Sequence, residues 1–192
     1  QGEVLVDGVD VKEYPFSQLR GMIGIVPQKA VLFKGTIRHN MQWRDKNATD
    51  EDIWNALDIA QAKDFVEKKP DKLDEMILQE GKNLSGGQRQ RLTIARALVG
   101  DPEILILDDS ASALDLATDA RLRKAIHEKT SGMTVFIVSQ RISSIKSADK
   151  IIVLDDGKIA GIGTHSELYK GCEVYKEICL SQLSEKEAQA NG

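Results

Sequence analysis

The sequence predicts an α/β fold built around a mostly parallel β-sheet. Residues 104–107 and 135–138 are short, uninterrupted apolar runs, which are typical of strands buried on both faces of such a sheet. Between them, from about residue 116 to residue 128, lies a stretch with helical character. Strands therefore alternate with helices, as parallel strands require, because a helix carries the chain back before the next strand begins.

Length and composition narrow the classes of protein that this chain can belong to. Its 192 residues, 41% of them apolar, fit one domain with a sizeable core. The formal net charge of −4 argues against a partner that is a nucleic acid. No apolar stretch approaches the ~18 residues of a membrane span, so we expect this segment to be soluble. Cys172 and Cys179 match no disulfide framework, which favours a reducing, cytosolic compartment.

Further strands are predicted by local patterns. Apolar residues flank an Asp-Gly pair in residues 4–11 and again in residues 151–162, and each pattern predicts an antiparallel hairpin. A short β run at residues 23–26 ends at a Pro-Gln pair. Thr164 and Glu167 have capping-box spacing and open a helical C-terminal tail.

The middle of the chain has the pattern of a helical insertion. Thr49 and Asp52 have capping-box spacing, and apolar residues follow at helical intervals as far as residue 77, with a break at residues 68–71. Another amphipathic helix is expected at residues 89–99.

These patterns together divide the chain into three kinds of segment. We expect an α/β core from residues 1–48 and 100–170, a helical subdomain at residues 49–99, and a helical tail at residues 171–192.

The stretch Ser85-Gly86-Gly87-Gln88 has the pattern of an anion-binding helix start. Ser85 as N-cap and Gln88 three residues later would satisfy two backbone amides, and the glycines would let a bulky ligand approach the backbone. A helix N-terminus with free amides suits a phosphate group. Taken alone, the stretch is equally consistent with a glycine-rich helix start that binds nothing.

Asp108 and Asp109 follow the first of the apolar strands. Ligands of an open parallel sheet bind beyond the carboxyl ends of its strands, where a carboxylate such as Asp108 can hold Mg²⁺. Asp109 could orient an attacking water. The alternatives are a helix-capping role for Asp108 and an ordinary solvated turn for Asp109.

These residues resemble motifs of the nucleotide-binding domain of ABC transporters, a P-loop NTPase-like fold. Leu84-Ser85-Gly86-Gly87-Gln88 matches the LSGGQ signature, and the apolar strand ending at Asp108 matches Walker B. The other matches are to the Q-loop, the D-loop ending and the switch-histidine position: Gln28, Asp115 and Gln140.

The resemblance implies how these residues would act. ATP with Mg²⁺ would be the ligand, with Gln28 and Asp108 at the metal, and Asp109 and Gln140 as the catalytic pair. In the family two domains enclose two ATP molecules, so residues 84–88 would contact the partner's nucleotide. Residues 33–40 and 161–165 look like the exporter form of the domain.

Three departures from the family pattern stand in the sequence. No G-x-x-x-x-G-K-[ST] motif is present, so we expect a fragment that lacks the P-loop strand and helix and is inactive by itself. Asp109 stands where the family has a catalytic Glu, which shortens the side chain by about 1.5 Å. Gln140 replaces the switch histidine and cannot carry its charge.

The resulting hypothesis is an ATPase module of a membrane exporter. It would lie on the cytoplasmic face of the membrane, belong to a parent chain with transmembrane domains, and form a heterodimer in which this subunit has the degenerate site. The alternative is a non-catalytic nucleotide-sensing or interaction module. The sheet surface left open by the missing P-loop segment predicts self-association of the fragment.

Overall fold

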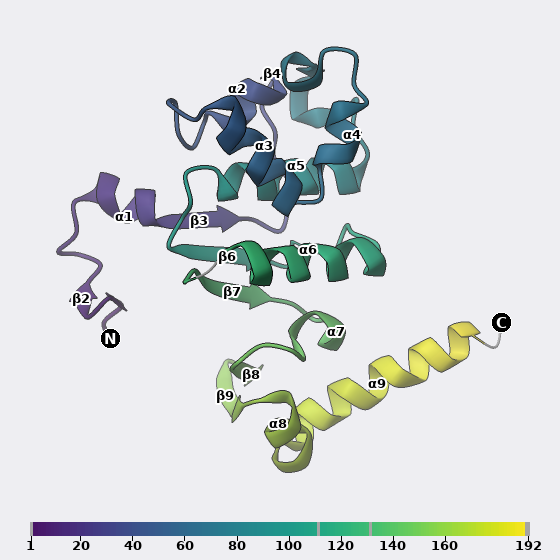
Figure 1. The fold of residues 1–192 in the computed structure, drawn as a ribbon. Coiled ribbons are helices and arrows are strands. Elements are labelled where there is room, and N and C mark those ends of the chain that lie inside the picture. Colours follow the sequence, from purple (N-terminus) through teal and green to yellow (C-terminus); the bar gives the residue numbers. More distant parts are fainter. Residues whose placement is uncertain (1, 111, 131, 191–192) are drawn as a thin grey trace. The chain divides into compact units, whose positions relative to one another are not determined.

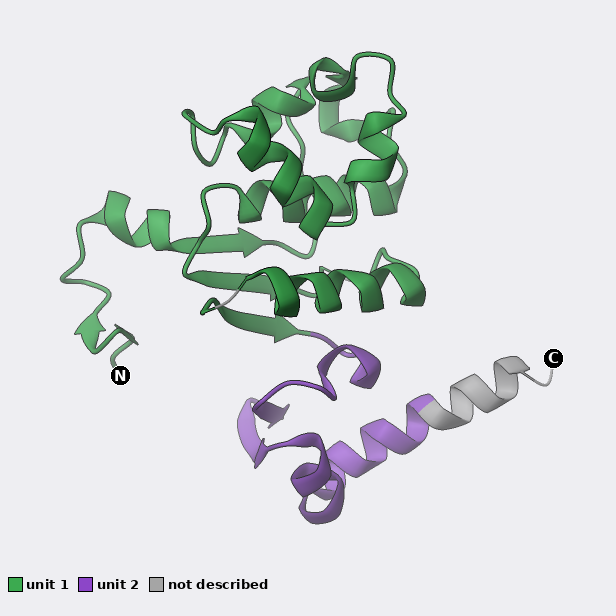
Figure 2. Ribbon diagram, viewed as in Figure 1, with its two compact units in different colours: residues 1–138 green, residues 139–192 purple. Residues whose placement is uncertain are grey.

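A computed structural model describes residues 2–110, 112–130 and 132–190 of the chain, with side chains described up to residue 182. The chain forms two compact units, Gln1–Val138 and Ser139–Gly192 (Figure 2). The three-part division expected from the sequence stays a prediction.

The first unit contains the predicted parallel sheet. Strands β3 (Ile23–Val26), β6 (Ile104–Asp108) and β7 (Thr134–Val138) pair in the order β3-β6-β7, all parallel (Figure 1). The carboxyl ends of the three strands therefore meet at one edge, as the sequence predicted for an α/β fold.

The prediction that the strands at residues 104–107 and 135–138 are buried on both faces is wrong. Leu105 is fully buried on the inner face, whereas the outer face exposes Ile25 and Phe136, with exposed fractions of 60% and 54%. Ile106, which pairs with both, is only half-buried. The reason is that the apolar core of this unit, which includes residues of the two long helices at 86–98 and 116–129, forms on the inner face of the strands.

Two long helices accompany the sheet. Helix α5 (Gly86–Leu98) lies along β3, and α6 (Leu116–Lys129) links β6 to β7 (Figure 1). Gly24 allows the α5 contact, since a Cβ at this position would lie 2.5 Å from the backbone oxygen of Ala97. Both helices were predicted from the sequence within a few residues.

The helical insertion differs from its prediction. Helices α3 (Asp50–Ile59) and α4 (Lys63–Glu67) break at residues 60–62, and residues 72–77 form a 3₁₀ turn, η1 (Lys72–Asp74), and strand β5 (Met76–Ile77) instead of a second helix. The β5 strand pairs with β4 (Gly35–Thr36), so a long-range pairing overrides the local helical pattern. The 3₁₀ turn η2 (Gln79–Gly81) then leads towards α5.

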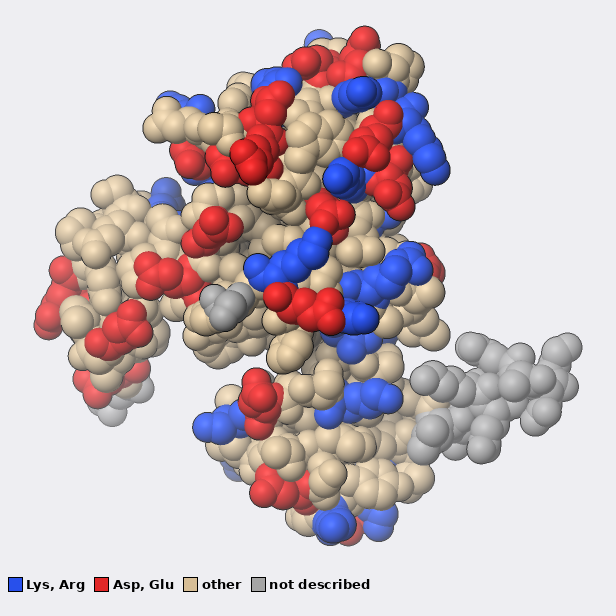
Figure 3. All heavy atoms as spheres, in the orientation of Figure 1, with Lys and Arg blue, Asp and Glu red and all other residues tan. Residues whose placement is uncertain are grey.

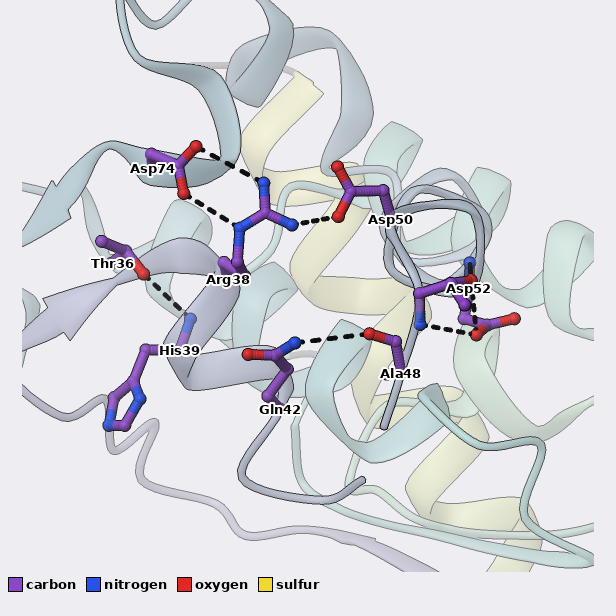
Figure 4. Close-up of polar contacts among 9 residues, drawn as sticks. Thr36, Arg38, His39, Gln42, Ala48, Asp50, Asp52 and Asp74 are labelled. Carbon is purple, nitrogen blue, oxygen red and sulfur yellow. Dashed lines mark hydrogen bonds and ion pairs between the residues drawn. The ribbon is translucent and has the colours of Figure 1, made fainter. Parts of the chain in front are cut away.

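Side-chain caps start the helices of this region, and one arginine joins the insertion to the residues before it. Thr36 caps α2 (Ile37–Met41) and Thr49 forms the predicted capping box with Asp52. Arg38 of α2 bridges Asp50 at the start of α3 and Asp74 of η1 (Figure 4). Bonds to both carboxylates raise the pKa of Arg38.

The N-terminal residues form the predicted hairpin from β1 (Leu5–Val6) and β2 (Val9–Asp10), followed by α1 (Phe16–Met22), which the sequence analysis did not predict.

The second unit contains the predicted antiparallel hairpin of β8 (Ile151–Asp155) and β9 (Lys158–Gly163) with the helices α7 (Ile142–Ile145), α8 (His165–Gly171) and α9 (Glu173–Ala190). Thr164 and Glu167 form the predicted capping box of α8. Cys172 and Cys179 are buried free thiols, as expected.

Two features of the described residues relate to nucleic-acid binding and to membrane crossing: the distribution of surface charge and the length of the helices. On the face drawn in Figure 3, acidic and basic side chains are mixed over the helical insertion and α6, without a continuous basic stripe. Among the described helices, none combines the length and the apolar composition that a membrane crossing needs.

Candidate functional site

The start of α5 has the capping geometry that the sequence predicts. The Gln88 backbone amide donates to Ser85 Oγ at 3.2 Å, and the Ser85 amide donates to Gln88 Oε1 at 3.0 Å. This box leaves the amides of Gly86 and Gly87 outside any hydrogen bond among the described residues. Two free amides at the positive end of a 13-residue helix form a place where an anion is stabilised.

The two glycines of this helix start have different surroundings. A Cβ on Gly87 would lie 3.4 Å from the Ala113 backbone oxygen and 3.8 Å from the Leu114 side chain. A Cβ on Gly86 would meet only the Arg89 guanidinium, at 4.0 Å, and the backbone there has no positive φ. The fold therefore does not itself require a glycine at position 86, whereas a ligand that approaches the backbone closely would.

Leu84 and Asp115 have structural roles in the described chain. Leu84, next to the cap, is buried in the core. Asp115 is the N-cap of α6, where its carboxylate accepts from the Thr118 amide at 2.9 Å and from the Thr118 hydroxyl at 2.7 Å. The hydroxyl bond is the main reason why the pKa of Asp115 lies below its ordinary value.

The structure brings Gln28, Asp108 and Asp109 to the carboxyl edge of the sheet. Gln28 lies just after β3, and its amide nitrogen donates to Asp109 Oδ2 at 3.3 Å. The Asp109 amide donates to the Val138 carbonyl at 2.9 Å, so this residue connects the ends of all three parallel strands. Its φ of 43° is left-handed, a conformation that Asp adopts more readily than most residues.

Asp108 and Gln28 provide oxygen donors of the kind that Mg²⁺ uses. The exposed Asp108 carboxylate ends β6, and the side-chain oxygen of Gln28 remains available, because its nitrogen makes the bond to Asp109. No group of three His, Cys, Asp or Glu side chains within the described ranges could hold a metal by itself. Two oxygen donors fit Mg²⁺, which usually takes one or two protein ligands together with phosphate oxygens and water.

Gln140 lies in the second unit, where its loop is held by the C-terminal helix. Gln182 of α9 donates through its side-chain nitrogen to the Gln140 carbonyl and accepts from the Ile142 amide at 2.9 Å. This two-point contact fixes the backbone that follows β7.

Asn83 and Arg91, on either side of residues 84–88, make supporting contacts that the sequence did not predict. Asn83 accepts from the Leu78 amide at 3.0 Å and donates to the Met76 carbonyl at 2.9 Å. Arg91 donates to the Gln61 carbonyl at 2.6 Å, and burial lowers the pKa of its guanidinium. The Arg91 contact joins residues 30 positions apart in the sequence, and neither side chain has a spacing that would have indicated its partner.

Comparisons with known proteins agree with this arrangement. The family model described as ABC transporter matches residues 1–112. An uncharacterized ABC transporter ATP-binding protein of Mycobacterium tuberculosis is 45% identical over 184 residues, which are 94% of this chain and 31% of that protein. A probable multidrug resistance ABC transporter ATP-binding/permease protein of Bacillus subtilis is 42% identical over 92% of this chain and 30% of its own length.

The structure of a bacterial Atm1-family ABC exporter with ATP bound is similar to this chain with a TM-score of 0.88 and 35% identity, over 95% of this chain and 32% of the exporter chain. This chain thus spans about a third of the length of these relatives. The matched family model, the identities and the shared fold agree, and the chain belongs to the ABC transporter family.

Proposed function

We propose that this chain is the nucleotide-binding part of an ABC exporter and that its Ser85–Gln88 cap binds the terminal phosphate of an ATP held by a second nucleotide-binding domain. The open space at Gly86 beside two free amides is the observation on which the proposal rests. Binding across the interface would favour a closed pair of domains, and hydrolysis to ADP and phosphate would release it.

The residues at the carboxyl edge of the sheet would serve the chain's own nucleotide. Asp108 and Gln28 would hold Mg²⁺ on the phosphates, and the metal supplies charge neutralisation during phosphoryl transfer. Asp109 would accept a hydrogen bond from the attacking water. A positioned base contributes about 10²–10⁴-fold to a rate, and this carboxylate is one methylene shorter than the family's Glu.

Gln140 supports the proposal of a weak site. A glutamine amide can donate a hydrogen bond to a phosphate oxygen, but it carries no charge at any pH of interest. Asp109 and Gln140 together point to a subunit whose own site turns over slowly and whose cap serves a more active partner. Such a chain would form a heterodimer.

The sequence contains no P-loop motif, so neither a lysine nor a cradle of amides for the β- and γ-phosphates is present in these residues. We infer that the 192-residue chain alone does not hydrolyse ATP. The P-loop strand and helix would come from the longer parent protein, which would also carry the transmembrane domains and place this part at the cytoplasmic face of the membrane.

A second candidate function is a nucleotide-sensing module that closes on ATP without hydrolysing it. The hydrogen bond between Gln28 and Asp109 favours it, because it ties a metal ligand to the residue that would position water. The two candidates differ in turnover: a sensor binds ATP with Mg²⁺ in the intact assembly and releases no phosphate.

The decisive experiment uses the full-length protein with its partner subunit and compares Gly86→Ala, Ser85→Ala and Asp109→Asn. Gly86→Ala should stabilise the fold by up to about 1 kcal/mol, because alanine is the better helix former, and should still abolish most ATPase activity by filling the phosphate position. Ser85→Ala should also remove most activity, and Asp109→Asn should remove little.

The reverse ranking, with Asp109→Asn inactive and Gly86→Ala fully active, would exclude the proposed role of the cap. Phosphate release that remains absent even in the wild-type assembly, with intact ATP binding, would favour the sensor instead.

A further inference from the structure

The loop before the Ser85–Gln88 cap is held by one arginine of the helix that it precedes. Arg89 lies one turn into α5, and helical side chains point towards the N-terminus, so its guanidinium lies over the first turn. Its Nη1 donates to the Leu84 carbonyl at 3.2 Å and to the Gly81 carbonyl at 3.5 Å. Arg89 therefore contacts the backbone at both ends of the 81–84 loop.

The loop is shaped to receive this side chain. Gly81 has a φ of +68°, and a Cβ there would lie 2.8 Å from Arg89 Cδ and 3.0 Å from Cγ. Glu80 before it is also left-handed, with a φ of 58°, and the Leu84 amide closes the turn on the Gly81 carbonyl at 2.9 Å. The arginine stem occupies the space that any side chain at position 81 would need.

The positive charge of Arg89 is not neutralised by an acidic side chain among the described residues. Arg89 forms no ion pair among the described residues, and its Nη2 lies 4.0 Å from the position of a Cβ on Gly86. A guanidinium has five N–H donors, and the loop uses only those of Nη1. The remaining donors lie beside the free amides of the cap.

We propose that Arg89 is a positioning residue of the phosphate-binding cap: it fixes the Gly81–Leu84 loop so that the amides of Gly86 and Gly87 present to the phosphate of the neighbouring domain's ATP. This inference rests on the proposed function. It adds a residue outside the five-residue signature, and the arginine stem, together with the left-handed backbone, explains why position 81 holds a glycine.

The test measures kcat, KM for ATP and the Kd of ADP in the full-length assembly. Arg89→Met keeps the stem over Gly81 and removes the donors, so kcat should fall roughly tenfold while ADP affinity and the circular dichroism spectrum stay unchanged. Arg89→Lys keeps charge and stem without the planar fork, so a loss of only about threefold is expected. Lys68→Met removes an exposed charge outside this loop and should leave kcat unchanged.

A double-mutant cycle tests the role of Gly81. Gly81→Ala displaces the arginine stem and also places a Cβ on a residue with a φ of +68°, so it should lower kcat more in the wild-type background than in an Arg89→Ala background, where only the backbone strain remains. Equal losses in both backgrounds, or an unchanged kcat in Arg89→Met, would overturn the inference.

The result for Gly86→Ala distinguishes a failure of the role assigned to Arg89 from a failure of the proposed function of the Ser85–Gln88 cap. If Gly86→Ala is inactive and Arg89→Met is fully active, only the role of Arg89 is wrong. If Gly86→Ala is fully active, the proposed function itself fails.

Discussion

The two faces of the β3-β6-β7 sheet show how differently one apolar pattern can be used. On the inner face, Gly24 lies so close to the α5 backbone that a methyl group would not fit, and Leu105 is fully buried. On the outer face, Ile25 and Phe136 are mostly exposed. The inner face therefore stabilises this chain, and the outer face is an apolar surface left for another segment or molecule to cover.

The largest effect is expected at the closest inner contact. In Gly24→Ala the new Cβ would lie 2.5 Å from the Ala97 carbonyl oxygen, a backbone atom that cannot move without shifting α5. We expect a loss of about 3 kcal/mol in the free energy of unfolding, measured by urea denaturation. Gly21→Ala, with nothing within 4 Å of its Cβ, is the matched control and should cost nothing. Equal stability of the two variants would show that the inner face is more loosely packed than described.

The second prediction concerns the three hydrogen bonds that Arg44 donates to backbone carbonyls near the start of β3 and the end of α5. Arg44 donates to the carbonyls of Val99 at 2.7 Å, Ile23 at 2.9 Å and Gly21 at 2.7 Å, which joins the end of α5 to the start of β3. Arg44→Met leaves three acceptors without this donor, so we expect a loss of about 1–3 kcal/mol in urea denaturation. Arg44→Lys should recover part of it, and a lysine variant no better than methionine would contradict the role of the planar fork.

The third prediction concerns the outer face. Phe136→Thr replaces an exposed aromatic ring with a good strand former, so the free energy of unfolding should change by less than about 1 kcal/mol. Self-association of the 192-residue chain, measured by sedimentation velocity over a range of concentrations, should decrease. Met76→Thr, at an apolar residue that is 48% exposed outside this sheet, should leave the association unchanged. Association that persists in Phe136→Thr would mean that another surface mediates it.

The same contrast explains how much the sequence could predict. The strand ending at Asp108 and the capping box at Ser85 depend on neighbours in the sequence, and both were predicted correctly. Strand β5 depends on pairing with β4, and the outer face of the sheet depends on what covers it, so local patterns misjudged both. The motif positions were found through resemblance, whereas the Gln28–Asp109 bond joins residues 81 positions apart, a distance that no local pattern spans.

The smallest effect is expected at Asp115, the N-cap of α6. Because the Thr118 hydroxyl and amide hold the pKa of Asp115 below its ordinary value, the charged carboxylate stabilises the folded state. This contribution is fully present above the unfolded pKa of about 3.9 and is lost as the pH falls through the lower folded value.

Asp115→Asn keeps a capping oxygen and removes the titration, so its stability should depend less on pH below about pH 4 than that of the wild type. Thr118→Val should also weaken the dependence of stability on pH in acid, because the Thr118 hydroxyl is the larger cause of the lowered Asp115 pKa. The double variant should depend on pH little less than either single variant. Urea denaturation at a series of pH values from 7 to 3 measures how the free energy of unfolding depends on pH. The same dependence in the wild type and in both single variants would show that the cap does not contribute to acid stability.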